Sequence, residues 1–431
     1  MLHDVREFVR ISRYLAKWTL LAGCLGLMAG LASAVFLVGL DWVTTIRLDH
    51  PWLLYLLPAA GLAMGLFYWR LAPDLERGSN LLLDEIHGPN RGVPLKLAPT
   101  ILVATWVSHL FGASVGREGT AIQMGGSLAS GIARLTRLDR HDLRVLLMAG
   151  IAAGFGSVFG TPLAGMVFGM EVLALGRLRY DGLIPCLVGS CVGDAACRWL
   201  THQWHYQHSH YAVTKVPPLD AMLVGKVLVA SMAFALISVA FTELQHGVKR
   251  MFERWAGWPP LRYVIGGVGV IGLASLFGDE YLGLSLPLLQ RSFEPAGVPT
   301  LAFFGKLVFT AWTLGAGFKG GEVTPLFIMG ATAGFMLGGI LGVPPDYLAA
   351  LGFVAVFAAA ANTPLACTLM GLELFSTSVP IEHASMFALA CISAYIWSGH
   401  RGIYVAQRVH VAKGDSVPLE SETHIGSMPR R

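Results

Sequence analysis

Charged residues are scarce in this chain of 431 residues: only 13% are Asp, Glu, Lys or Arg, whereas 54% are hydrophobic. Soluble domains carry about 25% charged residues, so this composition excludes an ordinary soluble fold. Nucleic-acid binding needs a basic face outside the apolar segments, and no segment is left to supply one. A mean hydropathy of +0.60 instead indicates an integral membrane protein.

Signatures of catalysis and of metal binding are also lacking. The chain has no HExxH pattern and no nucleophile with a matching base. We therefore predict that it is not an enzyme, with an intramembrane hydrolase as a remote alternative. The six cysteines lie mostly in apolar runs and suit neither zinc nor a disulfide framework, so we interpret them as packing residues. Four histidines (His202, His205, His208 and His210) have spacings that could bind a metal, but in a polar linker we expect them only to be solvated; we predict no metal and no cofactor.

Long uncharged runs are present instead. Trp18–Leu40, Val323–Pro345 and Tyr347–Leu372 contain no charged residue. A hydrocarbon core about 30 Å thick needs roughly 20 apolar residues of helix. Because every backbone amide must be paired inside lipid, these runs should be helical. We therefore predict an all-α, polytopic membrane protein, and the basic segment Met1–Lys17 predicts a cytoplasmic N-terminus.

Two motifs occur twice, in the same order. Gly116–Thr120 resembles Gly320–Thr324 at an offset of 204 residues, and Thr161–Ala164 matches Thr363–Ala366 at an offset of 202. Two motifs repeated at nearly one offset indicate two related halves, as is typical of transporters. The repeat does not show whether the halves are parallel or inverted. We divide the chain into a cytoplasmic N-terminal segment, a first half, an extramembrane linker, a second half and a flexible C-terminal tail, at residues 1–17, 18–200, 201–219, 220–404 and 405–431.

Each half places Gly-rich, polar sequence directly before an apolar helix. A helix that begins inside the membrane presents free amides and a positive dipole end, which together attract an anion. Glu118 lies at the first of these starts, and an acid within the membrane is expected to be functional. As a carboxylate it would resemble the bound anion, and on protonation it would leave the site. The alternative is an acid that only stabilises its own helix.

Four further residues are candidates at these helix ends. Glu322 is the equivalent acid in the second half, where a helix cap is the alternative to a functional role, and Thr324 offers a hydroxyl to an anion or to Glu322. Glu171 and Glu373 lie nine residues after their prolines, near the ends of short helices. For this second pair we favour a structural role.

At these positions the sequence resembles the CLC family of anion channels and transporters. Gly116–Gly119 matches the GREG motif that carries the family's gating glutamate, and Gly78-Ser79 matches the start of its first anion-site motif. Gly320–Pro325 stands in place of the GGIFxP motif, and Tyr404 falls where the family has its central anion-binding tyrosine. The resemblance implies inverted repeats with broken helices, a homodimer with one pore in each subunit, and either channel or anion/proton antiporter activity.

Departures from the commonest pattern resemble the fluoride/proton antiporter branch of the family. The Gly-Glu-Val-Thr-Pro form of the third motif and Asn80 are typical of that branch. Val172 stands where chloride/proton exchangers have an inner proton-transfer glutamate, whereas Ser79 is the serine of the chloride members. The resemblance implies an anion site that includes Ser79, Asn80, Gly116, Arg117, Gly119, Val323 and Tyr404, with proton coupling by Glu118, Glu322 and Thr324.

We therefore expect export of fluoride in exchange for protons across the cell (inner) membrane. The open alternatives are a chloride or nitrate transporter of the same fold and a passive channel, because the same motifs serve all three.

Overall fold

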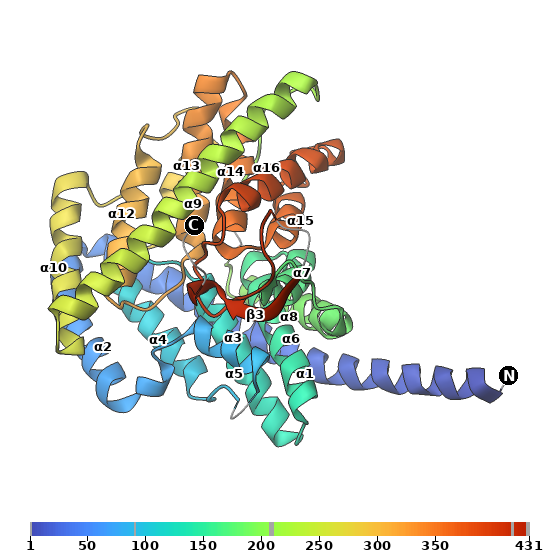
Figure 1. The fold of residues 1–431 in the computed structure, drawn as a ribbon. Coiled ribbons are helices and arrows are strands. Elements are labelled where there is room, and N and C mark those ends of the chain that lie inside the picture. Colours follow the sequence, from blue (N-terminus) through green and yellow to red (C-terminus); the bar gives the residue numbers. More distant parts are fainter. Residues whose placement is uncertain (1, 90–91, 207–210, 415–417, 428–431) are drawn as a thin grey trace.

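The computed structural model describes residues 2–89, 92–206, 211–414 and 418–427. Within these residues the chain is almost entirely helical (Figure 1). Up to residue 203, the chain contains α1 (Leu2–Asp49), η1 (Pro51–Leu56), α2 (Leu57–Leu71), η2 (Pro73–Leu75), α3 (Ser79–His87), α4 (Leu97–Leu110), α5 (Glu118–Leu135), α6 (Arg140–Phe159), α7 (Pro162–Glu171), β1 (Ala174–Leu175), η3 (Tyr180–Gly182) and α8 (Leu183–Gln203). The remainder contains α9 (Ala221–Trp255), α10 (Pro259–Phe277), α11 (Leu286–Arg291), α12 (Ala302–Gly315), α13 (Val323–Leu341), α14 (Pro345–Ala361), α15 (Pro364–Phe375), η4 (Ile381–His383), α16 (Ala384–Trp397), β2 (Arg408–Val411), β3 (Pro418–His424) and η5 (Ile425–Ser427).

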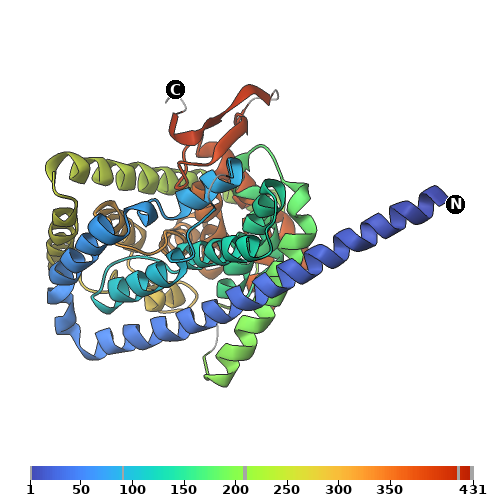
Figure 2. The ribbon, with the colours of Figure 1, turned by 90° about the horizontal axis from the view of Figure 1, so that it is seen from below.

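The first helix is much longer than one membrane crossing requires. It has 48 residues, and its N-terminal part projects from the body of the molecule (Figure 2). The uncharged run Trp18–Leu40 lies wholly inside it, where α1 packs against α8 and α6. Among the described residues, seven helices are long and apolar enough to cross a membrane. The prediction of a polytopic all-α membrane protein is confirmed.

The other two uncharged runs each contain a break between two helices. Tyr347–Leu372 is divided between α14 and α15, because Asn362 adopts a left-handed φ of 57° and Pro364, which has no N–H, begins a new helix. Val323–Pro345 likewise contains the end of α13 and the start of α14. The runs are helical as expected, and the absence of charge did not reveal these breaks, because the residues that break the helices carry no charge.

The two halves use the same close helix packing. In the first half, Gly125 of α5 faces Gly150 of α6, and a Cβ added to either would collide with the other residue's carbonyl group. In the second half, Gly330 of α13 and Gly352 of α14 face each other in the same way. Small residues let helix backbones approach closely inside a membrane. The sequence repeat therefore corresponds to a repeated packing arrangement.

Equivalent helices of the two halves run in opposite directions. At the end of α7, the carboxylate of Glu171 accepts two backbone N–H groups from the first turn of α15, at 3.0 and 2.8 Å. At the end of α15, Glu373 accepts two N–H groups from the first turn of α7, at 2.9 and 2.8 Å. Such reciprocal contacts require antiparallel helices, so the halves are inverted. Both acids have the structural role favoured from the sequence, since they satisfy amides at helix starts.

We predict that removing either acid destabilises the protein. Glu171→Ala or Glu373→Ala leaves two helix-start amides without an acceptor and should lower the free energy of unfolding by about 1–3 kcal/mol. Thermal unfolding of the detergent-solubilised protein measures the change. Glu382→Ala, at an exposed acid in η4, is the control and should have no effect. Wild-type stability of both cap variants would show that other groups satisfy these amides.

The end of the linker is packed onto the second half. The backbone N–H and Oγ1 of Thr214 both donate to Asp346, at the start of α14, at 2.6 Å. The ring of Tyr211 packs against Phe293 and Phe353, with centroid distances of 5.3 and 6.0 Å. This part of the linker therefore covers the second half.

The C-terminal residues form a small sheet where their polarity had predicted only a flexible tail. β2 pairs in parallel with β1 of the first half and antiparallel with β3. Just before β2, the buried side chain of Gln407 donates to the carbonyl oxygens of Val172 at 2.9 Å and Ala361 at 3.2 Å. These partners come from both halves and are distant in sequence, which is why the local pattern did not reveal the attachment.

Candidate functional site

The two Gly-rich segments cross at the centre of the molecule. Gly116 N–H donates to Gly321 O at 2.6 Å, and Gly321 N–H donates back to Gly116 O at 2.8 Å. A Cβ on Gly116 would lie 2.9 Å from Gly321 O, and one on Gly119 would lie 3.1 Å from Gly321 Cα, so this approach requires glycine. Directly after the crossing, α5 begins at Glu118 and α13 begins at the buried Val323. Helix starts from both halves thus meet in one region.

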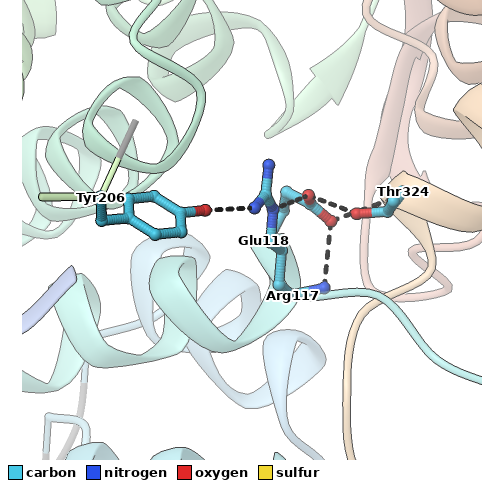
Figure 3. A network of polar contacts seen from close by, with 4 residues as sticks. All are labelled: Arg117, Glu118, Tyr206 and Thr324. Carbon is cyan, nitrogen blue, oxygen red and sulfur yellow. Dashed lines mark hydrogen bonds and ion pairs between the residues drawn. The ribbon is translucent and has the colours of Figure 1, made fainter. Parts of the chain in front are cut away.

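The carboxylate of Glu118 is fully buried at the start of the opposite helix (Figure 3). Its Oε2 accepts the backbone N–H of Thr324 at 3.0 Å, and its Oε1 accepts the Thr324 hydroxyl. Arg117 donates to the same carboxylate through its backbone N, at 3.2 Å, and through Nε, at 3.3 Å. Four donors from two residues therefore converge on a single anionic group.

This geometry puts Glu118 where an anion would bind. Thr324 is the second residue of α13, and the free amides of a helix start favour negative charge. Glu118 accepts one backbone N–H at the start of its own helix, from Arg117, but it also accepts the backbone N–H and the hydroxyl group of Thr324 at the start of the opposite helix. Protonation of the carboxyl group would weaken these charge-assisted bonds and release the side chain.

Glu322 is equivalent to Glu118 in the repeat but has different surroundings. Its Oε1 accepts from Gln245 Nε2 of α9 at 3.4 Å. Its Oε2 faces the start of α5, 3.8 Å from the position of a Cβ on Gly119. Although it stands at the N-cap position of α13, its side chain makes no capping hydrogen bond. The symmetry of the repeat therefore does not extend to the chemistry of the two acids.

A cavity of about 200 Å³ lies on the Glu322 side of the crossing. Three of the residues assigned to the anion site, Ser79, Asn80 and Tyr404, line it together with Glu322. Its wall also includes one further acid, Glu76, and four cationic side chains, so that cations outnumber acids: Arg77, Lys249, Arg262 and Lys319. A lining of this charge raises the local concentration of anions. We call this space the inner cavity.

A much smaller cavity of about 20 Å³ lies on the Glu118 side and is called the outer cavity. Its polar lining includes Arg117, Glu118 and Thr324, and most of the remaining wall is apolar or aromatic, including Phe159, Phe327 and Phe353. Roughly 10–15 Å³ is enough for one water molecule, so the outer cavity has room for one species of that size. Fluoride is close to water in size, whereas chloride is larger.

Tyr404 and Ser79 line the inner cavity and carry hydroxyl groups, whereas the Asn80 side chain is already engaged. The buried Tyr404 Oη has no hydrogen-bond partner among the described residues. Ser79 Oγ accepts from Gln123 Nε2 at 3.3 Å. Asn80 Oδ1 accepts the backbone N–H of Ala406 at 3.1 Å, so this side chain holds the segment that carries Tyr404. A buried hydroxyl without a partner is costly, and an anion would satisfy it.

The interpretation of the sequence missed several polar residues of the site. Gln123 and the fully buried Lys306 lie in mainly apolar parts of their helices, whereas Gln245 follows Glu243 in the polar part of α9. For the first two residues that pattern is the signal, because a polar group inside the membrane needs a specific partner. Tyr206 carries no such signal, yet its Oη accepts from Arg117 Nη1 at 3.2 Å.

The segment Gly112–Gly116 matches the G-x-S-x-G spacing of a hydrolase nucleophile elbow. However, a helix rather than a strand precedes it, and Ser114 Oγ is buried between Lys306 Nζ, at 3.0 Å, and the carbonyl oxygen of Tyr281, at 2.8 Å. Ser114 is therefore part of the packing and is not exposed as an elbow nucleophile is.

Within the described ranges, no group of three or more His, Cys, Asp or Glu side chains is arranged to hold a metal ion. His208 and His210 of the linker lie outside those ranges. Cys186, Cys197, Cys367 and Cys391 are buried, whereas Cys24 and Cys191 are exposed.

Comparison with known proteins places the chain among ion transporters. The family model for voltage gated chloride channels matches residues 60–399. A chloride/fluoride channel protein from Pseudomonas syringae pv. tomato is 48% identical over 422 residues, covering 96% of this chain and 91% of that protein. The H(+)/Cl(-) exchange transporter ClcA of Vibrio cholerae is 28% identical over 384 residues, covering 81% and 80% of the two chains.

Solved structures agree with this placement. The crystal structure of a CLC-type fluoride/proton antiporter matches with a TM-score of 0.87 at 30% identity, covering 92% of this chain and 98% of that one. The structure of a slow cyanobacterial Cl-/H+ antiporter matches with a TM-score of 0.75 at 19% identity, covering 88% and 94%, and supports the fold alone. The family match over residues 60–399 and the structural match over 92% of the chain show that it is a multi-pass membrane protein of the voltage gated chloride channel (CLC) family.

Proposed function

We propose that this protein exports fluoride from the cell in exchange for protons. The observation that carries the proposal is the buried carboxylate of Glu118 at the start of α13, bonded to Thr324 of the other half. A titratable group at the anion's own position couples the two ions. When Glu118 is charged it excludes the anion, and when it is protonated it makes room for it.

The cycle begins in the inner cavity. Its cationic lining attracts fluoride, and the hydroxyl groups of Tyr404 and Ser79 replace part of the hydration of the ion. Fluoride then passes the backbone of Gly116, Gly119 and Val323, which lie where the two helix starts cross. Fluoride and the Glu118 carboxylate then compete for the amide and hydroxyl of Thr324. A proton from outside neutralises Glu118, which leaves the helix start, and fluoride passes to the outer cavity.

Glu322 and Thr324 tune the exchange. Glu322 borders the inner cavity and is close to the start of α5, where it can take up the proton that Glu118 releases. The position of the inner glutamate of chloride/proton exchangers is occupied by Val172, which is buried and cannot carry a proton. Proton transfer through Glu322 is therefore part of the proposal.

Relatives support fluoride as the substrate. The similar solved structure is that of a fluoride/proton antiporter, and the name of the Pseudomonas relative includes fluoride. Within this chain, the outer cavity has room for a small anion. The second candidate is chloride transport, favoured by the exchanger from Vibrio and by Ser79, which is retained at the inner cavity.

Efflux from proteoliposomes loaded with fluoride or chloride, with pH recorded at the same time, tests the proposal. We expect fast fluoride efflux, little chloride efflux, and proton movement opposite to fluoride. Comparable chloride efflux would move the protein to the chloride transporters. Fluoride efflux without proton movement would show a channel, in which Glu118 acts only as a gate.

We further propose that the protein works as a homodimer in the cell (inner) membrane, with fluoride, protons and lipid as its partners, no cofactor and no enzymatic reaction. Family membership supports the dimer, because the family resemblance implies a homodimer in which each subunit has its own pore. Light scattering of the purified protein, corrected for detergent, measures its oligomeric state.

A further inference from the structure

We infer that Tyr206, in the segment that joins the two halves, is a positioning residue for the exchange: its hydroxyl holds Arg117 against Glu118 and so sets the pH range in which Glu118 leaves the anion site. The inference rests on the proposed function.

The guanidinium of Arg117 is held at both ends. Its Nε donates to Glu118 Oε1 at 3.3 Å, and its Nη1 donates to Tyr206 Oη at 3.2 Å. The group lies between the phenol and the carboxylate (Figure 3). Only 8% of the Arg117 side chain is exposed, so its guanidinium depends on protein acceptors.

A phenol suits this position because it is a neutral acceptor. A second carboxylate would also anchor the guanidinium, but it would share the positive charge that Glu118 now receives. The Tyr206 hydroxyl fixes the guanidinium without neutralising it. Tyr206 comes from the linker, whereas Arg117 and Glu118 come from the start of α5, so this hydrogen bond connects the linker to the transport site.

Other titratable groups face this cluster from several elements. Glu322, before α13, and Tyr404, after α16, interact electrostatically with Glu118. Tyr211 of the linker and Cys197 of α8 interact with Arg117. These groups are neutral or acidic, and Arg117 is the cation that forms an ion pair with Glu118. The position of this guanidinium therefore decides how strongly the charged form of Glu118 is stabilised.

Loss of the Tyr206 hydroxyl should shift the pH dependence in a defined direction. Without its outer anchor, the guanidinium can turn away from Glu118, and the carboxylate loses part of its stabilisation. The Glu118 side chain then leaves the helix start more readily. We expect the pH of half-maximal fluoride efflux to rise by about 0.5–1 unit, as for one charge displaced by a few ångströms.

The experiment measures initial fluoride efflux from proteoliposomes at a series of pH values. Wild type is compared with Tyr206→Phe, Arg117→Gln and the double variant. Tyr55→Phe, which changes an exposed tyrosine in η1, is the matched control and should keep the wild-type profile. If the Phe variant does not assemble, Tyr206→Met removes the same hydroxyl with a flexible side chain.

The double variant decides the inference. An upward shift in Tyr206→Phe that disappears in the Arg117→Gln background supports it, because Tyr206 then acts through Arg117. A wild-type profile in Tyr206→Phe, or an equal shift in both backgrounds, overturns it. Wild-type protein that moves fluoride without protons refutes the exchange function instead; the same four profiles of fluoride efflux still test the contact with Arg117.

Discussion

Replacing Glu118 with Gln should reduce fluoride-driven proton movement by at least about 100-fold, the usual contribution of a positioned proton-transfer group. Glutamine has nearly the same shape and can still accept the amide N–H of Thr324, but it cannot take up and release a proton. As a neutral group, like the protonated glutamate, this side chain should leave the anion's place more readily than the carboxylate does. Simultaneous fluoride and pH recordings on proteoliposomes measure both fluxes.

A matched control is available on α9. Glu253 is an exposed acid near the end of this helix, and Glu253→Gln should leave both fluxes unchanged. Fluoride flux in Glu118→Gln separates two roles of the residue: continued flux without protons indicates lost coupling, and loss of both fluxes indicates a closed gate. Unchanged proton transport in the variant would contradict the role assigned to Glu118.

The second large effect is expected at Lys306. Its buried Nζ donates to Ser114 Oγ at 3.0 Å, Tyr281 O at 3.1 Å, Gly283 O at 2.8 Å and Ser285 Oγ at 2.9 Å. Lys306→Met removes the donor that these four oxygen atoms share. Each oxygen atom that stays unsatisfied lowers the free energy of unfolding by about 1–3 kcal/mol. We expect two of these oxygen atoms to stay unsatisfied, which lowers the free energy of unfolding by about 2–6 kcal/mol. Thermal unfolding in detergent measures the loss.

The transport site should also be affected, because Ser114 lies two residues before Gly116 and anchors the segment that leads to Glu118. Lys226→Met is the control: Lys226 makes a single exposed contact with Gly342 O, at 3.2 Å, and its loss should cost less than about 0.5 kcal/mol. Equal stability of Lys306→Met and wild type would show that water or a rearranged Ser285 replaces the ammonium group.

Much of the transport site was predictable because its signals are local. Glu118 stands out as an acid at the start of an apolar helix, and the two Gly-rich segments are recognisable as a repeat. The contact between Glu118 and Thr324, however, joins residues 206 positions apart. The repeat suggested two equivalent acids, but in the structure Glu322 bonds to Gln245 of α9. Local sequence carries no information about that choice.

Other features depended on distant partners and were missed for the same reason. The tail pairs with β1 because Ala174 and Leu175 offer backbone groups far away in sequence. Asn362 interrupts a run of apolar residues through its backbone conformation, which hydropathy does not register. Tyr206 is one polar residue in a polar linker, and only its contact with Arg117 makes it notable.

By itself, the sequence determined that this is a helical membrane protein with two related halves, and where the helices that carry the site begin. It could do so because lipid requires each segment to satisfy its own backbone amides, so length, charge and glycine patterns are sufficient. Only the tertiary structure decided that the halves are inverted, that Glu118 occupies the start of the opposite helix, and that a linker tyrosine holds Arg117. Those contacts join residues that lie 89 to 210 positions apart, and they arise from the packing of whole helices.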